Sequence, residues 1–120
     1  MSKTILIVDD AGSIRQVVNM ALTRAGYNVI EAVDGLDACA KLVAPKIDLI
    51  ICDFNMPRMD GLTFVKHVKE SAHKFTPVLM LTTESSPAIK AEGRAAGVRG
   101  WVVKPFQPAQ LVDAVAKLCA

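Results

Sequence analysis

The sequence predicts an α/β protein with a doubly wound, five-stranded parallel sheet in the order 2-1-3-4-5 and helices on both faces. The first observation is that short apolar runs alternate with segments of helical periodicity along the whole chain. The second is that three runs, ILIV, LIIC and VLML, are nearly continuous in apolar residues, as in strands covered on both faces. The third is that 120 residues hold five strand-like runs, which favours this order over the six-stranded alternative.

The three apolar runs are predicted as central strands, whereas the mixed run YNVIEA suits an edge and the last run is short. Because helices separate the strands, right-handed crossovers make all of the strands parallel. The predicted strands are Ile5–Asp9, Asn28–Ala32, Leu49–Asp53, Val78–Thr82 and Gly100–Val103.

Capping residues mark where the intervening helices begin and end. Residues 13–16 have capping-box spacing, with Ser13 as the cap of the first helix. The later starts are predicted at Asp34, Asp60, Ser86 with Pro87, and Pro108. The predicted stops are Gly26, Pro45 and Gly97.

Composition indicates one globular domain over residues 1–120, without an effector domain. The net charge of +2 is far below the basic excess typical of nucleic-acid-binding domains, and 52% hydrophobic residues exclude disorder. The apolar stretches are too short for a membrane span or a signal peptide. Cys39, Cys52 and Cys119 lack CxxC spacing and are predicted to be buried free thiols, so we expect a cytoplasmic protein.

Polar side chains follow the points where four predicted strands end. They are Asp9 and Asp10, Asp53, Thr82 and Thr83, and Lys104. In a parallel sheet these ends share one edge, and ligands bind there beside the switch point between strands one and three. Taken singly, each residue has a plainer interpretation, such as a helix cap at Asp10 or an exposed lysine at Lys104. Their joint occurrence favours a functional site.

Three carboxylates from Asp9, Asp10 and Asp53 would repel one another, which would raise at least one pKa. A hard divalent cation relieves this repulsion, and oxygen ligands without His or Cys suit Mg²⁺, with Mn²⁺ as a substitute. With Lys104 as a cation and Thr82 as a hydroxyl donor, the predicted site suits phosphoryl chemistry.

Four motifs in order make the chain resemble the receiver domains of CheY-type response regulators over essentially all 120 residues. They are Val8-Asp9-Asp10, residues 53–57 with Asp60-Gly61, Leu81-Thr82, and residues 103–106. The resemblance implies the flavodoxin-like (CheY-like) fold, whose strand order is the one predicted above. It also implies a cis peptide between Lys104 and Pro105.

The resemblance implies a role for each matching residue. Asp53 would accept the phosphoryl group from the phosphohistidine of a sensor histidine kinase. Asp9, Asp10, Asp53 and the backbone carbonyl of Asn55 would hold Mg²⁺. Lys104 would pair with a phosphoryl oxygen, and Thr82 would move to hydrogen-bond the phosphoryl group.

Further positions in the family govern output and dephosphorylation. Trp101 stands where the switch aromatic is usually Tyr, Phe or His, and its indole needs more room. Thr83 stands where a small residue is common. Asn55, Thr83 and Glu84 would tune dephosphorylation.

The function implied is that of a stand-alone, monomeric phospho-receiver that is not a conventional enzyme. Its output face would be formed by helix four, strand five and helix five, and would bind a protein such as a flagellar motor switch protein or a phosphatase. A phosphate sink or a relay intermediate fits the sequence almost as well. An aspartyl-phosphate phosphatase is disfavoured, because Asn55 stands where a second carboxylate would be needed.

Overall fold

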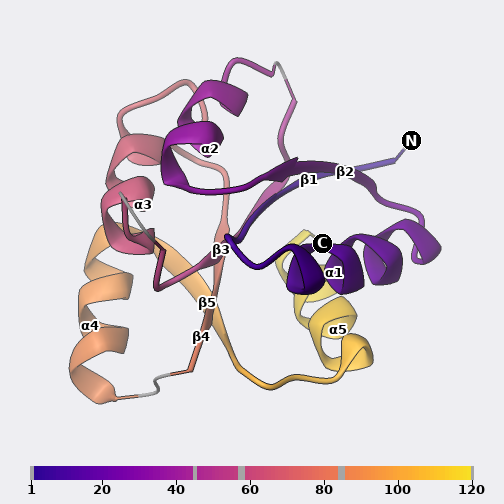
Figure 1. Ribbon diagram of the computed structural model, residues 1–120. Coiled ribbons are helices and arrows are strands. Elements are labelled where there is room, and N and C mark those ends of the chain that lie inside the picture. Colours follow the sequence, from indigo (N-terminus) through magenta and orange to yellow (C-terminus); the bar gives the residue numbers. More distant parts are fainter. Residues whose placement is uncertain (1, 45, 57–58, 84–85, 120) are drawn as a thin grey trace.

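A computed structural model describes residues 2–44, 46–56, 59–83 and 86–119 (Figure 1). Five strands alternate with five helices in this part of the chain. The strands are β1 (Thr4–Val8), β2 (Asn28–Ala32), β3 (Leu49–Asp53), β4 (Val78–Thr82) and β5 (Val98–Val103). The helices are α1 (Gly12–Arg24), α2 (Gly35–Lys41), α3 (Gly61–Lys69), α4 (Pro87–Ala96) and α5 (Pro108–Cys119).

The strands form one parallel sheet in the order β2-β1-β3-β4-β5, as predicted. The three apolar runs are its central strands, and β2 is an edge strand, both as predicted. The predicted bounds of two strands were wrong. β1 runs from Thr4 to Val8, so Asp9 lies just beyond its end, and β5 begins two residues earlier than predicted, at Val98.

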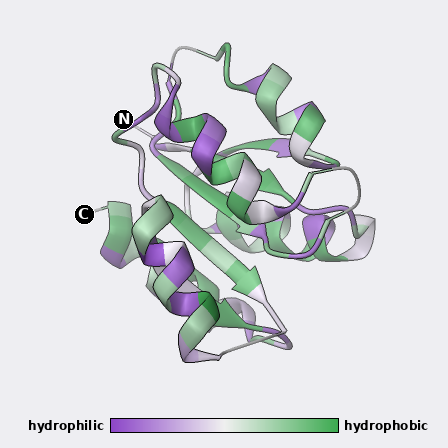
Figure 2. Cartoon of the chain, turned by 90° about the vertical axis from the view of Figure 1, so that its left-hand side faces the viewer, coloured by the Kyte–Doolittle hydropathy of each residue, from purple (hydrophilic) through white to green (hydrophobic). Residues whose placement is uncertain are grey.

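Helices cover both faces of the sheet, and each face has its own apolar core. Figure 1 shows α1 and α5 on one side and α2, α3 and α4 on the other. Alternate residues of each strand divide between the two cores: Leu6 faces α2 and α3, whereas Ile7 faces α1 and α5. Figure 2 shows that the strands between the helix layers are largely hydrophobic. Burial of both faces explains why the central strands do not alternate in polarity.

Three of the predicted helix starts are confirmed by side-chain caps. The carboxylates of Asp34 and Asp60 accept hydrogen bonds from the backbone N–H groups of Asp37 and Thr63, and the Ser86 hydroxyl accepts one from Ile89. Pro108 begins α5, as predicted.

The predicted cap of the first helix was wrong. The helix begins at Gly12, so Ser13 lies inside its first turn and cannot cap it. The Asp9 carboxylate instead accepts a hydrogen bond of 2.9 Å from the Ala11 N–H group at this helix start. A residue of the predicted site therefore also orders the loop that joins β1 to α1.

Two helices end just before the predicted stop glycines. Gly97 has φ of 110° at the end of α4, and Gly26 has φ of 96° just after α1, a conformation that glycine adopts without strain. The second helix ends at Lys41, before the predicted stop at Pro45, which lies outside the described residues.

The three cysteines are free thiols, as predicted, but only Cys52 and Cys119 are buried, whereas Cys39 is partly exposed. Within the described ranges, every helix is too short or too polar to cross a bilayer.

Candidate functional site

The carboxyl edge of the sheet brings together residues that are far apart in the sequence. Asp9 follows β1, Asp53 ends β3, Thr82 ends β4 and Lys104 follows β5. The switch point lies between β1 and β3, because β1 pairs with β2 on one side and β3 on the other (Figure 1). The site therefore lies where this fold places ligands.

Lys104 joins two buried carboxylates. Its Nζ lies 3.2 Å from Oδ2 of Asp9 and 3.1 Å from Oδ1 of Asp53, and it donates a hydrogen bond to each. The Asp9 side chain is fully buried and that of Asp53 is 8% exposed, whereas the Lys104 side chain keeps 17% exposure. The Lys104 backbone N–H donates to the Thr82 carbonyl at 2.8 Å, which holds the lysine beside the end of β4.

Asp10 adds a third carboxylate to this pair. One oxygen from each of Asp9, Asp10 and Asp53 lies within 4.8 Å of the other two, and Asp10 is exposed whereas the other two are buried. Such an oxygen-only set fits a hard cation such as Mg²⁺, which keeps several positions for water and phosphate oxygens. The exposed Asp10 leaves the cluster open to solvent on one side.

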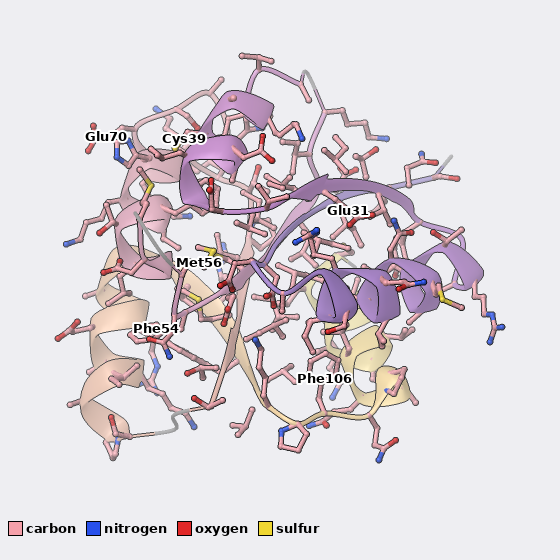
Figure 3. All side chains as sticks on the ribbon, in the orientation of Figure 1. Glu31, Cys39, Phe54, Met56, Glu70 and Phe106 are labelled. Carbon is pink, nitrogen blue, oxygen red and sulfur yellow. The ribbon has the colours of Figure 1, made fainter. Side chains whose placement is uncertain are left out.

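Arg15 of α1 holds the loop that carries Asp9 and Asp10. Its Nη1 donates to the Asp9 backbone carbonyl at 2.7 Å, and its Nε pairs with Glu31 of β2 at 3.2 Å. Figure 3 labels Glu31 on β2, next to the start of α1. Sequence reasoning missed Arg15, because it assigned Arg15 only to a capping box.

Gly61 lies close to the other side of the site. A Cβ at this position would lie 2.6 Å from the Asp53 carbonyl oxygen and 3.0 Å from Cα of Phe54. The Gly61 N–H also donates to the Phe54 carbonyl at 2.9 Å. A side chain at Gly61 would push α3 away from the end of β3, so glycine is required here for packing. The sequence showed Gly61 only as part of a motif and a helix start.

The charges of the site shift the pKa values of Asp53 and Lys104. Burial raises the pKa of Asp53, and the neighbouring Asp9 charge adds to the rise, which Lys104 only partly offsets. Burial by itself would lower the pKa of Lys104, but Asp9 and Asp53 outweigh that effect and raise it. The ionised Asp53 is therefore less favourable in the folded state than in water, whereas the charged lysine is favoured.

This shift predicts a pH dependence of stability in metal-free buffer. Because the pKa of Asp53 in the folded protein lies above its ordinary value of 3.8, folding favours the protonated acid. The contribution of Asp53 to stability is therefore lost as pH rises from about 3.8 through the folded pKa. Urea unfolding between pH 4 and pH 7 should show the stability of Asp53→Asn rising relative to the parent as pH increases. A difference between Asp53→Asn and the parent that does not change with pH would contradict this.

The remaining predicted residues that the structure describes differ in burial. Thr82 is fully buried, Thr83 is exposed, and Asn55 is exposed in the bend that follows Asp53. Trp101 of β5 is partly buried and packs against the core under α3 and α4. Glu84 and Pro57 lie outside the described residues.

An open apolar cavity of about 400 Å³ adjoins Lys104 on the side of α1 and α5. It is lined by Ile14, Val17, Thr83, Lys104, Pro105 and Phe106. The peptide bond between Lys104 and Pro105 is cis, as predicted. Figure 3 shows Phe106 toward α5, and Phe54 and Met56 toward α3 and α4. The loops after β3 and β5 thus border the site from opposite sides.

Comparisons with known proteins agree with this geometry. A family model described as the response regulator receiver domain matches residues 5–116. The solved structure of chemotaxis protein CheY4 from Vibrio cholerae has a TM-score of 0.94 and 50% identity, covering 98% of this chain and 99% of that chain. Chemotaxis protein CheY1 from Helicobacter pylori is 41% identical over 112 residues, which are 91% of this chain and 90% of CheY1.

Transcriptional regulatory protein ResD from Bacillus subtilis is 39% identical over 108 residues. This match covers 90% of the present chain but only 44% of ResD. The chain therefore spans less than half the length of that relative.

The chain belongs to the response regulator receiver domain family. Receiver domains are signalling domains of two-component systems rather than classical enzymes, and their phosphodonor is a histidine kinase. The family typically binds Mg²⁺ at an acidic pocket, and the cluster of Asp9, Asp10 and Asp53 is a pocket of that kind. The fold and the family predicted from the sequence are confirmed.

Proposed function

We propose that the chain is a phospho-accepting response regulator in which Asp53 receives a phosphoryl group from the phosphohistidine of a sensor kinase. An Asp53 carboxylate oxygen attacks phosphorus, the phosphorus–nitrogen bond breaks, and the released imidazole takes up a proton from solvent. The product is an acyl phosphate on Asp53. The observation that carries the proposal is the bridge of Lys104 between Asp9 and Asp53, with the Asp10 carboxylate in the same cluster.

Each side chain supplies one part of this chemistry. Lys104 offers an ammonium group next to the attacking carboxylate, where it can pair with a phosphoryl oxygen. Asp9, Asp10, Asp53 and the carbonyl of Asn55 would hold Mg²⁺. When bound, the cation neutralises phosphoryl oxygens. The buried Thr82 hydroxyl lies at the end of the neighbouring strand, where it can donate to the modified group.

The exposed Asn55 and Thr83 border the site, and we propose that they and Glu84 govern loss of the phosphoryl group. Asn55 and Thr83 are both exposed, and each lies within two residues of a strand end that carries a site residue, Asp53 or Thr82. The cavity beside Thr83 leaves room for such an approach.

We further propose a stand-alone, monomeric regulator of the chemotaxis type, in line with the near-complete coverage of CheY1 and CheY4. Phosphorylation would change the surface of α4, β5 and α5, which would bind a flagellar motor switch protein or a phosphatase. Binding to a motor switch peptide only in the presence of beryllofluoride would support this output. Fast phosphate loss without any binding partner would indicate a phosphate sink or a relay intermediate instead.

Phosphoryl incorporation tests the central claim. The purified protein is incubated with MgCl₂ and a small acyl phosphate, and its intact mass is measured. We expect one phosphoryl group on the parent and on Asp113→Asn, the matched control, because Asp113 is exposed on α5. Incorporation should fall to background in Asp53→Asn, whose amide is not a nucleophile for this reaction, and in the parent with excess EDTA. Equal labelling of Asp53→Asn and the parent would refute Asp53 as the acceptor.

A further inference from the structure

The indole of Trp101 lies against the backbone of α4 at Gly93. A Cβ at Gly93 would overlap Cζ2 of the indole and would lie 2.8 Å from Cη2 and 3.4 Å from Cε2. These atoms belong to the six-membered ring of the indole. Gly93 is buried, and the ring occupies the space that any side chain at this position would need.

The backbone of α4 does not require glycine at position 93. Of the glycines, only Gly26 and Gly97 have positive φ, and Gly93 lies inside the helix. Glycine inside a helix is less favourable than alanine, because it loses more backbone freedom on folding. Close contact with Trp101 is therefore the structural reason for glycine at this position.

Shape, rather than hydrogen bonding, holds the indole in place. Nε1 of Trp101 is inaccessible to solvent and has no hydrogen-bond partner among the residues that the structure describes. A buried donor without an acceptor is unfavourable. The ring also packs against the apolar core under α3 and α4. Close packing against the core and Gly93 therefore has to offset the cost of the unpaired N–H group.

This contact connects α4 to the strand ends of the site. Trp101 pairs with Met80 in the register of β4 and β5, and Val103 pairs with Thr82. Because side chains alternate along a strand, Trp101 lies on the same face of the sheet as Met80 and Thr82. The indole therefore lies on the face of the sheet that Thr82 shares, and directly against Gly93.

We propose that Gly93 is the positioning residue that admits the indole of Trp101 beneath α4, so that a methyl group at position 93 drives the ring toward solvent. The consequence for signalling rests on the proposed function, because the displaced ring would alter the surface formed by α4 and β5. The placement of the ring itself does not depend on phosphorylation.

Fluorescence tests the placement directly, because Trp101 is the only tryptophan. In metal-free buffer without a phosphodonor, Gly93→Ala should shift the emission maximum to longer wavelength and increase quenching by iodide. The matched control is Gly12→Ala, which also adds a methyl group to a helix. A Cβ at Gly12 would meet only the Arg15 guanidinium at 3.5 Å, so the emission should match the parent. Unchanged emission and quenching in Gly93→Ala would overturn the proposal.

A double-variant cycle keeps the test decisive if Gly93→Ala folds poorly. Trp101→Phe removes the outer ring that fills the space at Gly93. In the Trp101→Phe background, alanine at position 93 should raise the urea midpoint, because alanine favours the helix. In the parent background the same change should lower the midpoint. Equal midpoint changes in the two backgrounds would overturn the proposal.

The two proposals can fail separately. Phosphoryl incorporation at Asp53 should persist in Gly93→Ala, because neither Gly93 nor Trp101 contributes a group to the carboxylate cluster. Loss of incorporation from the parent would reject the proposed function and leave the fluorescence result intact. Unchanged fluorescence of Gly93→Ala would reject the placement by Gly93 and leave phosphoryl transfer intact.

Discussion

Replacing Lys104 with methionine should lower the free energy of unfolding in metal-free buffer by about 3 kcal/mol. This value is at the lower end of the range for removing one partner of a buried ion pair, because the lysine side chain keeps 17% exposure. Methionine retains most of the apolar stem, so lost packing contributes little. The loss arises because the fully buried Asp9 and the nearly buried Asp53 would face each other without a cation.

Urea unfolding in EDTA measures this loss. The matched control is Lys117→Met on the exposed face of α5, which should change stability by no more than about 0.5 kcal/mol. The loss in Lys104→Met should shrink as pH falls, since protonation of Asp53, whose pKa is raised, removes its repulsion with Asp9. Added Mg²⁺ should also recover part of it. A loss no larger than that of Lys117→Met would show that the bridge contributes nothing to the fold.

Magnesium should stabilise the parent by about 2.7 kcal/mol at a concentration one hundred times its dissociation constant. The physical reason is that the cation binds the folded cluster of Asp9, Asp10 and Asp53. Unfolding separates Asp53 from Asp9 and Asp10, which are distant from it in the sequence. The gain should appear in urea unfolding as a higher midpoint with an unchanged slope.

The control for magnesium is NaCl at the same ionic strength, which screens repulsion without occupying the site. Asp10→Asn should lose much of the magnesium effect, because the amide replaces one charged ligand of the cluster. Asp113→Asn should keep the full effect, since Asp113 is exposed on α5. An equal gain from NaCl, or a full gain in Asp10→Asn, would contradict a site built from these three carboxylates.

Much of the fold could be predicted because its signals are local. The apolar runs of β1, β3 and β4 identify strands that are buried on both faces. Asp34, Asp60 and Ser86 each cap the helix that begins at the next residue, namely α2, α3 and α4. The first helix shows the limit of such signals. Ser13 has the spacing of a cap, but the chain turns into the helix earlier, where the Asp9 carboxylate accepts the Ala11 N–H group.

The sequence predicted which residues lie at the candidate site, but not which of them form hydrogen bonds with one another. Parallel strands place Asp9, Asp53, Thr82 and Lys104 at one edge, which follows from topology alone. That Lys104 bridges Asp9 and Asp53 depends on the positions of strand ends separated by 95 and 51 residues. No local pattern encodes such a distance.

The order of apolar runs, polar strand ends and capping residues was sufficient to determine the fold class and the residue types at the carboxyl edge. Periodicity and capping act between near neighbours, so they can be recognised in a linear chain. The tertiary structure alone determined three contacts: Arg15 with the Asp9 carbonyl, Gly61 with the end of β3, and Gly93 with the indole of Trp101. These contacts depend on how closely separate elements pack, which is set by the shape of the whole core.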